Sequence, residues 1–291
     1  MENILEVNNI NKSFGTHTVL EDVSFKINPG EIIGLVGRNG SGKTTLMKCI
    51  LGLISIDAGE ILFNDSSEYY KNKDLMDQIG YLLDCKLFEN LNAYENIKIQ
   101  EWYKGKRYKK EKEKAIIEDI LNLVDLKNDN KKVKAYSFGM KQRLGLALAL
   151  LGNTRLLILD EPFVGLDPVG IQIIRNFIIK MSKERNMAIL ISSHQLSEIE
   201  GICERYLFIS DRRIKAYAYD ERRKVIIYTK TQIPEEIKSI IQEKNVTNRV
   251  ISFWFEEKVF NDVIKCLVTH NVIIKDIKLS KMSLDKLFKE E

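Results

Sequence analysis

The run Gly37-Arg38-Asn39-Gly40-Ser41-Gly42-Lys43-Thr44 places glycines, a lysine and a hydroxyl residue at the spacing of a phosphate-binding loop. Glycines at these positions let backbone N–H groups wrap around phosphate oxygens, and a helix that begins at the lysine adds the positive end of its dipole. We expect Lys43 to reach the β- and γ-phosphates and Thr44 to place its hydroxyl on Mg²⁺. Together with Thr45, this loop is the predicted nucleotide-binding site.

Two carboxylates follow the apolar run Leu156–Leu159. Successive side chains of a strand point to opposite faces, so Asp160 and Glu161 are expected to take different roles. We expect Asp160 to hold Mg²⁺, directly or through water, and Glu161 to polarise the attacking water as general base. The alternative is two ordinary acids that cap a strand. Their position at a second predicted strand end, downstream of Lys43, argues against it.

These groups need a sheet whose strand ends meet at one edge. Alternation and short apolar runs predict five strands: Ile4–Ile10, Val19–Ile27, Glu31–Gly37, Leu156–Leu159 and Ala188–Ile191. Helical patterning runs from Lys43 to near Gly52 and over Ile171–Ser182, and a polar, basic, helix-rich segment spans about residues 87–151. Strands that alternate with helices predict an α/β domain with a largely parallel sheet, which we place at residues 1–215.

The pattern beyond this domain predicts a small C-terminal α+β domain at residues 216–291. Three strands are predicted at Lys224–Lys230, Arg249–Glu256 and Val272–Leu279, and two helices at Pro234–Lys244 and Ser283–Glu290. A further helix is indicated by apolar residues that share one face: Val259, Phe260, Val263, Ile264, Leu267 and Val268.

Composition and charge exclude several classes of protein. The 291 residues are 44% hydrophobic and 30% charged, and the net charge of +4 is too small to indicate bulk nucleic-acid affinity. The longest uncharged run, Asn186–Ser197, is shorter than the ~20 apolar residues of a membrane-spanning helix. The N-terminus lacks the pattern of a secretory signal. These features predict a cytoplasmic protein.

Cysteine and histidine spacing gives no sign of a metal site. Neither His17 nor His270 has a partner at a metal-site spacing, and the four cysteines are dispersed: Cys49, Cys85, Cys203 and Cys266. We expect reduced thiols.

Further runs resemble one family, the ATPases of ATP-binding cassette (ABC) transporters. Tyr136–Leu144 (YSFGMKQRL) resembles the family's signature motif, Gly165–Pro168 its D-loop, and His194 its switch histidine. Phe14 stands where the family has an aromatic residue that stacks on adenine. The sequence of residues 136–168 is similar to that of the bacitracin-resistance and lantibiotic-immunity branch of ABC exporters.

The resemblance implies a P-loop NTPase fold with a RecA-like core, a β-subdomain and a helical subdomain at about residues 85–151. It also implies that two cassettes pack head to tail, so that each chain's signature completes the site around its partner's Lys43. The signature residues are Ser137, Phe138, Gly139 and Met140. Asp167 would sense the opposite site, and His194 would contact the γ-phosphate and hold the attacking water. The implied catalytic set is therefore Glu161, His194 and Lys43, with ATP and Mg²⁺ as cofactors.

Three positions depart from the family's pattern. Asp84 stands in place of the Q-loop glutamine; a carboxylate there can face Mg²⁺ with Thr44 and Asp160, but it lacks the amide donor. The coupling of transport to hydrolysis is the property that this change affects. Phe138 and Met140 replace a usual glycine and glutamine of the signature, whereas Ser137 and Gly139 remain.

The implied function is ATP binding and hydrolysis for a multi-subunit transporter that exports antimicrobial peptide, antibiotic or similar hydrophobic cargo. The implied partners are a second cassette, in a homodimer or with a related ATPase, and separate transmembrane permease subunits that contact Asp84–Ile97. These permeases would hold the chain at the cytoplasmic face of the membrane, and no nucleic-acid partner is expected.

Two other functions stay open. One is the ATPase module of a sensing or resistance complex, and the other is a soluble ABC ATPase acting on nucleic acid or ribosomes. The single phosphate loop and the short interval between Thr44 and Ser137 disfavour the second, because they leave no room for a second cassette or a long coiled coil.

Overall fold

The computed structural model describes residues 3–84, 86–105, 108–218, 223–241 and 246–281. The chain divides into two compact units, Met1–Tyr219 and Asp220–Glu291. The division lies a few residues beyond the expected boundary at residue 215. The reason is that β9 (Arg213–Ala218) pairs with β8 (Arg205–Ser210), so it belongs to the sheet of the first unit.

The centre of the first unit is a six-stranded sheet with the order β5-β6-β7-β3-β8-β9. Its first four strands are β5 (Ile79–Leu82), β6 (Leu156–Leu159), β7 (Ala188–Ser193) and β3 (Ile32–Val36). These strands and β8 run parallel, and β9 is antiparallel to β8. Every residue of β3, β6 and β7 is buried, as expected for parallel strands covered on both faces. The segments that follow these strands therefore meet at one edge, and the predicted α/β fold is confirmed.

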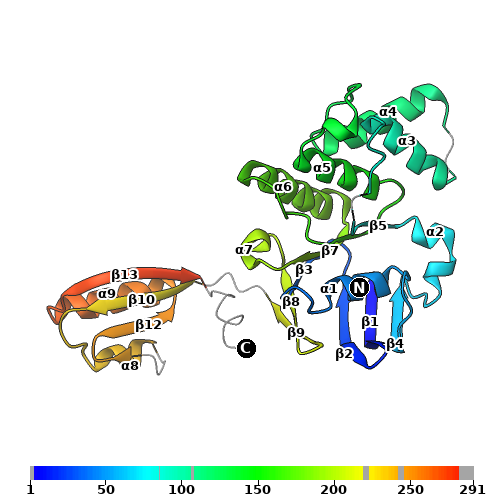
Figure 1. Ribbon diagram of the computed structural model, residues 1–291. Coiled ribbons are helices and arrows are strands. Elements are labelled where there is room, and N and C mark those ends of the chain that lie inside the picture. The colour runs from blue at the N-terminus through cyan, green and yellow to red at the C-terminus, as the bar shows by residue number, and fades with distance from the viewer. Residues whose placement is uncertain (1–2, 85, 106–107, 219–222, 242–245, 282–291) are drawn as a thin grey trace. The chain divides into compact units, whose positions relative to one another are not determined.

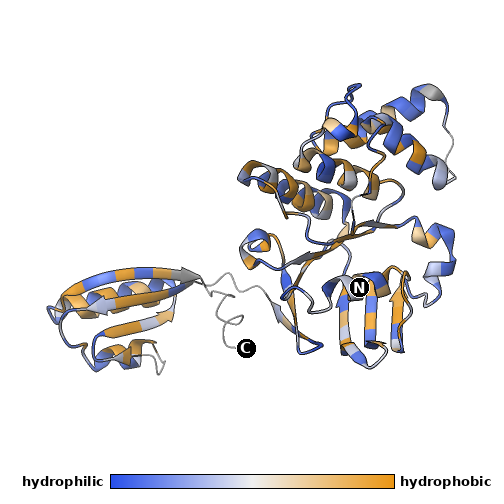
Figure 2. Ribbon diagram, viewed as in Figure 1, coloured by the Kyte–Doolittle hydropathy of each residue, from blue (hydrophilic) through white to orange (hydrophobic). Residues whose placement is uncertain are grey.

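A second, antiparallel sheet with the order β2-β1-β4 covers one face through α1. It contains β1 (Leu5–Phe14), β2 (His17–Ile27) and β4 (Ala58–Phe63), and α1 spans Lys43–Ile50. Figure 1 shows α1 between the two sheets, and Figure 2 shows the alternating hydropathy of β1 and β2. Leu5, Leu46 and Leu190 belong to one core that joins both sheets and the helix. Full burial of a side chain of this size stabilises a fold by about 1.5–3 kcal/mol.

Two long helices cover the other face of the six-stranded sheet (Figure 1): α5 (Phe138–Ala149) and α6 (Pro168–Arg185). The helices α3 (Ala93–Tyr103) and α4 (Lys110–Leu123) pack against α5 and against each other. The short elements of this unit are α2 (Lys73–Met76), α7 (Leu196–Ile199) and two 3₁₀ turns, η1 (Tyr69–Lys71) and η2 (Val133–Ala135). A capping box starts α3: Asn92 accepts from the N–H of Glu95 and Glu95 accepts from the N–H of Asn92. No helix in the described part of the chain combines the length and apolarity that crossing a bilayer requires.

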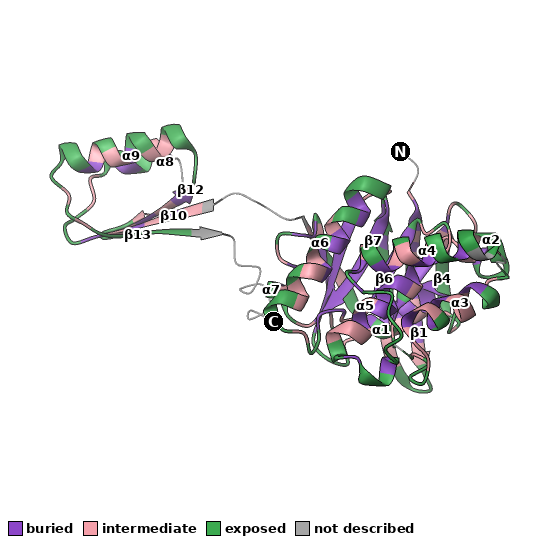
Figure 3. Ribbon diagram, turned by 90° about the horizontal axis from the view of Figure 1, so that it is seen from above, coloured by how far each residue is buried: buried purple, intermediate pink, exposed green. Residues whose placement is uncertain are grey.

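The second unit is a four-stranded antiparallel sheet with the order β11-β12-β10-β13. Its elements follow the chain order β-α-β-β-α-β: β10 (Arg223–Thr229), α8 (Glu236–Ile241), β11 (Val246–Thr247), β12 (Val250–Trp254), α9 (Glu257–Thr269) and β13 (Ile274–Lys281). Figure 3 shows both helices on one side of the sheet. The predicted α+β class is confirmed.

The core of this unit lies between the sheet and its two helices. Its buried members are Val225, Ile227, Ile237, Ile241, Ile251, Phe253, Val263 and Leu267. The prediction that Val268 shares the buried face of α9 is wrong, because its side chain is 65% exposed and Cys266 packs at the edge of the core instead. The predicted helix Ser283–Glu290 and the end of the predicted helix Pro234–Lys244 lie outside the described residues.

Candidate nucleotide-binding and hydrolysis site

The loop from Gly37 to Gly42 connects β3 to α1 along a path that requires glycine. Gly40 and Gly42 have φ values of 82° and 106°, in the left-handed region that side chains rarely adopt. A Cβ on Gly42 would lie 3.1 Å from the Cγ1 of Val19, so β2 passes directly beneath the loop. The Oγ of Ser41 is buried and makes no hydrogen bond to any described residue, which leaves it free for a phosphate oxygen. Arg38, Asn39 and Gly40 are exposed, and Thr45 is half-buried in the first turn of α1.

The ammonium of Lys43 is held inside this loop. Its Nζ donates to the carbonyl oxygens of Gly37 at 2.8 Å and Arg38 at 3.3 Å, and it lies 3.3 Å from Oε1 of Glu161. Only 6% of the lysine is exposed. A buried lysine ammonium next to a glycine-rich loop at the N-terminus of a helix is a site for the phosphates of a nucleotide.

Thr44 and Asp160 provide two oxygen donors next to the loop. The hydroxyl of Thr44 donates to Oδ2 of Asp160 at 2.6 Å, and the hydroxyl of Ser192 donates to Oδ1 at 2.5 Å. A hydroxyl and a carboxylate are the kind of oxygen ligands that Mg²⁺ prefers, so the residues present fit this ion.

Asp84 lies apart from this pair. It is exposed and lines a different pocket together with Tyr81, Lys86 and Gln100, and the contacts of the described residues do not join it to Thr44 or Asp160. Its role as a metal ligand stays a prediction.

Glu161 contacts both the phosphate loop and His194. Its Oε2 lies 2.7 Å from Nδ1 of His194 and 3.3 Å from the backbone nitrogen of that residue, while Oε1 faces Lys43. The carboxylate oxygen accepts a hydrogen bond from Nδ1, so Nδ1 carries the hydrogen. The other ring nitrogen, Nε2, accepts a hydrogen bond from the side-chain amide of Gln195 at 3.3 Å. Both contacts indicate the same tautomer.

The backbone at Glu161 is strained. Its φ is 48°, a value that costs a non-glycine residue of order 1–3 kcal/mol. The N–H of Glu161 donates to Oγ of Ser192 at 2.8 Å, which helps to hold this conformation. Such strain is concentrated at functional sites, so the observation agrees with a chemical role for the carboxylate.

Ser192 is a site residue that sequence reasoning missed. It is fully buried in β7, and its hydroxyl accepts from Glu161 and donates to Asp160. Two serines at the end of an otherwise apolar strand, directly before His194, were the signal that could have found it.

The signature and D-loop residues form a second group. Ser137 is the N-cap of α5 and accepts from the N–H of Met140 at 3.3 Å, and Asp167 is the N-cap of α6 and accepts from the N–H of Gly170 at 2.9 Å. A Cβ on Gly165 would lie 3.2 Å from the ring of Phe138, and one on Gly139 would lie 3.2 Å from Leu166. Both segments line one cavity of about 360 Å³, whose lining includes no residue of the phosphate loop.

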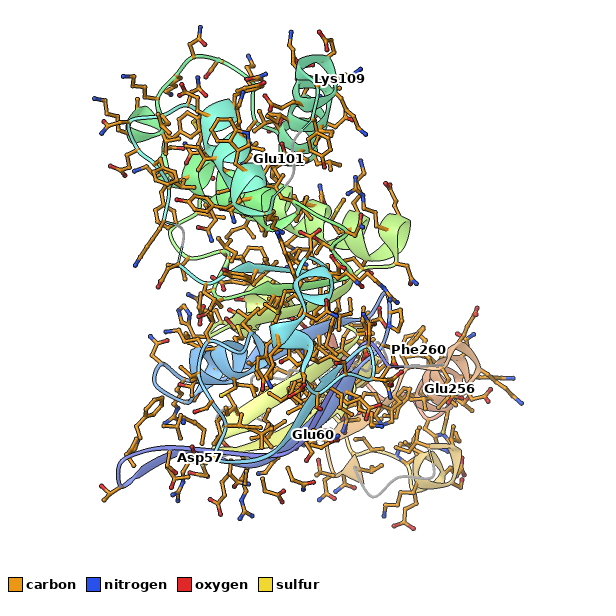
Figure 4. All side chains as sticks on the ribbon, turned by 90° about the vertical axis from the view of Figure 1, so that its right-hand side faces the viewer. Asp57, Glu60, Glu101, Lys109, Glu256 and Phe260 are labelled. Carbon is orange, nitrogen blue, oxygen red and sulfur yellow. The ribbon has the colours of Figure 1, made fainter. Side chains whose placement is uncertain are left out.

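Phe14 ends β1 with its ring 53% exposed. The ammonium of Lys12 lies 5.3 Å from the ring centroid and forms an ion pair with Asp57 at 3.0 Å, which keeps the cation in place. Figure 4 shows Asp57 beside the three-stranded sheet. The hydrogen bond from Lys12 lowers the pKa of Asp57 below its usual value. An exposed aromatic face of this kind can stack on a nucleobase.

The fold and this site are those of a nucleotide-binding α/β protein with a phosphate loop. A family model described as "ABC transporter" matches residues 20–164. The chain is 33% identical over 300 residues to the uncharacterized ABC transporter ATP-binding protein YhcH of Bacillus subtilis, an alignment that covers 100% of this chain and 96% of the relative. The chain therefore belongs to the family of ABC transporter ATP-binding proteins.

Two further relatives carry names that state a cargo. The lantibiotic transport ATP-binding protein SrtF of Streptococcus pyogenes is 41% identical over 213 residues, which cover 72% of this chain and 89% of the relative. The bacitracin transport ATP-binding protein BcrA of Bacillus licheniformis is 35% identical over 245 residues, which cover 83% and 78%.

Two solved structures share the fold. CbiO1 of Clostridium perfringens, part of the ABC transporter complex cbiONQ, aligns with a TM-score of 0.67 and 26% identity over 74% of this chain and 88% of its own. The dimeric ABC transporter cassette MJ0796 aligns with a TM-score of 0.67 and 22% identity over 74% and 98%. This chain is thus an ABC ATPase that binds ATP and couples its hydrolysis to transport.

Proposed function

We propose that this chain powers the export of an antimicrobial peptide, an antibiotic or a similar hydrophobic cargo. The proposal is supported by two relatives whose names assign them to lantibiotic and bacitracin transport, at 41% and 35% identity. The transported molecule itself would be selected by membrane subunits that are separate chains.

The arrangement of Glu161 carries the proposed hydrolytic mechanism. One of its oxygens faces Lys43 and the other faces His194, so a single carboxylate connects the phosphate loop to the switch histidine. In this proposal Lys43 binds the β- and γ-phosphates, and Glu161 takes the proton of the attacking water as general base. His194 orients that carboxylate and contacts the γ-phosphate. Mg²⁺, held by Thr44 and Asp160, would supply positive charge to the phosphate oxygens.

The proposed active unit is a dimer of cassettes. In this proposal Ser137, the N-cap of α5, and the following residues to Met140 bind the γ-phosphate of the ATP that the partner holds. Support for this arrangement comes from the common cavity of the signature and the D-loop, which is lined without the phosphate loop of the same chain. Asp167 would report the state of the opposite site.

We place the permease contact at Asp84–Ile97. This segment includes Phe88, whose side chain is 51% exposed, and it lies next to Tyr81, which is 47% exposed. Exposed aromatic residues of this size are typical of protein–protein contacts. Such a contact would hold the chain at the cytoplasmic face of the membrane.

The test is to co-express the tagged chain with the polytopic membrane proteins encoded beside its gene and to purify it from membranes. We expect a complex whose ATPase activity rises with a peptide antibiotic and which moves that peptide across proteoliposomes in an ATP-dependent manner. A complex in which Lys43 is replaced by alanine should assemble but not transport. A stable complex that hydrolyses ATP without moving peptide would overturn export and favour a signalling complex.

A further inference from the structure

Three side chains with metal-binding chemistry converge in the second unit. Glu236 begins α8, Cys266 lies in the last turn of α9, and His270 follows the end of that helix. Cys266 and His270 are four residues apart, so they lie on one face of α9. Within the described residues, this is the only trio of acidic, histidine or cysteine side chains whose ligand atoms all lie within 4.8 Å of one another.

The separations are close to those of ligands around one ion. The Nε2 of His270 lies 3.5 Å from Oε2 of Glu236, and the Sγ of Cys266 lies 4.0 Å from the same oxygen. A tetrahedral zinc with bonds of about 2.0–2.3 Å separates its ligand atoms by roughly 3.3–3.6 Å. Small side-chain rotations would close the difference, because Glu236 and His270 are exposed.

The His270 ring turns its Nε2 toward the carboxylate of Glu236. Its Nδ1 lies 3.0 Å from the carbonyl oxygen of Cys266, an acceptor, so Nδ1 carries a hydrogen and Nε2 is the ring nitrogen that can bind an ion. A histidine that donates one ring N–H to a backbone carbonyl and presents the other nitrogen is also the usual arrangement of a metal ligand.

We propose that Glu236, Cys266 and His270 bind one zinc-class divalent ion. Thiolate, imidazole and carboxylate together suit Zn²⁺ rather than the oxygen-preferring Mg²⁺, and three protein ligands leave a fourth position for water or another donor. The ion would tie α8 to α9 and so stabilise the second unit. Sequence reasoning found no metal spacing because it did not use the four-residue interval from Cys266 to His270 and because Glu236 comes from another helix.

The experiment uses the full, reduced chain with excess Mg²⁺, which occupies carboxylates of the nucleotide site. Zn²⁺ is titrated in competition with a chromophoric chelator, and Co²⁺ is added to a second sample and followed by absorption. We expect one equivalent of Zn²⁺ to bind and the Co²⁺ adduct to show a thiolate-to-cobalt charge-transfer band. Cys266→Ser should abolish the band, and Cys266→Ser and His270→Asn should each weaken Zn²⁺ binding by at least about tenfold.

Matched controls separate this site from others. His17→Asn replaces an exposed histidine of β2, and Glu60→Gln replaces an exposed acid of β4; both should bind Zn²⁺ like the wild-type chain. Alkylation of Cys266 in the wild-type chain should slow when Zn²⁺ is added, a readout that needs no variant. Absence of a one-equivalent site, or binding that survives both Cys266→Ser and His270→Asn, would overturn the proposal. None of these results depends on the transport function.

Discussion

Nδ1 of His194 lies 2.7 Å from Oε2 of Glu161, although the two residues follow different strands of the sheet. The histidine donates to the carboxylate and thereby fixes the oxygen that it contacts, while the second oxygen faces the ammonium of Lys43. A carboxylate held at both oxygens is oriented before any substrate arrives. In the proposed mechanism, this orientation is the contribution of His194 to the action of Glu161 as a base.

Replacement of Glu161 by glutamine should nearly stop hydrolysis without preventing ATP binding. Glutamine keeps the size of the side chain but cannot take a proton, and general-base catalysis typically contributes about 10²–10⁴-fold to turnover. We therefore expect kcat to fall by about that factor and an ATP-bound dimer to accumulate, as measured by size-exclusion chromatography with light scattering. Glu60→Gln, at an exposed position of β4, is the matched control. Unchanged turnover in Glu161→Gln would remove this residue from the role of base.

Replacement of Ser192 by alanine should reduce the turnover of ATP, because Glu161 and Asp160 would both lose a hydrogen bond that positions them. The variant leaves the N–H of Glu161 without its partner and removes one hydrogen bond from Asp160, a loss of about 1–3 kcal/mol in a buried position. Ser192→Thr should restore much of the activity because it keeps the hydroxyl. Both variants are to be compared by steady-state ATPase kinetics and urea unfolding.

Ser193→Ala is the control for this prediction, since its hydroxyl donates to Glu198 rather than to Asp160. Ser193→Ala should lower the free energy of unfolding about as much as Ser192→Ala does, but it should reduce the turnover of ATP less. Equal losses of turnover in Ser192→Ala and Ser193→Ala would reduce Ser192 to a structural residue.

The stability of the contact between α3 and α4 should depend on pH through Glu113. A hydrogen bond from Lys98 at 2.9 Å, together with one from the hydroxyl of Tyr94 at 2.8 Å, lowers the pKa of Glu113 below its usual value of 4.5. The charged form is thus favoured in the folded state. Its contribution is fully present above pH 4.5 and is lost as the pH falls through the lower pKa of the folded state. Burial raises the pKa of Tyr94 to about 12, so its hydroxyl remains a donor throughout.

The check is the urea midpoint of the wild-type chain and of Glu113→Gln as the pH is lowered from neutral. The difference between the two proteins should shrink below pH 4.5, because the wild-type chain alone loses this carboxylate contact. A difference that stays constant over the whole range would contradict the prediction.

The buried cysteines should resist alkylation in the folded chain. Burial raises the pKa of Cys49 to about 11 and raises that of Cys203 as well, and the thiolate is the form that reacts. At pH 8 we expect Cys49 to react with iodoacetamide about 10²-fold more slowly than in urea, as followed by mass spectrometry. Cys266, which is half-buried, is the internal comparison. Labelling of Cys49 at the same rate in both conditions would show that its surroundings are open.

Much of the fold could be predicted from residue patterns. Continuous apolar runs such as Leu156–Leu159 indicated the buried parallel strands, because only strands covered on both faces are apolar at every position. Alternation in residues 4–10 and 19–27 indicated the half-covered antiparallel sheet. The phosphate loop was recognisable because its glycines, lysine and hydroxyl are neighbours in the chain.

Contacts between distant segments could not be predicted in the same way. Whether the carboxylate of Glu161 meets His194, and whether one serine supports two acids, depends on strand order and on which side chains share a face. From the apolar pattern of α9, Val268 was predicted to be buried and Cys266 was not, whereas in the structure Val268 is exposed and Cys266 packs at the edge of the core. The direction of a helix face is fixed by what packs against it. The chain order therefore determines which chemical groups are present and which elements carry them. The packing of β6 beside β7 and of α8 against α9 decides which groups meet, because side chains from separate elements come within bonding distance only once those surfaces are buried together.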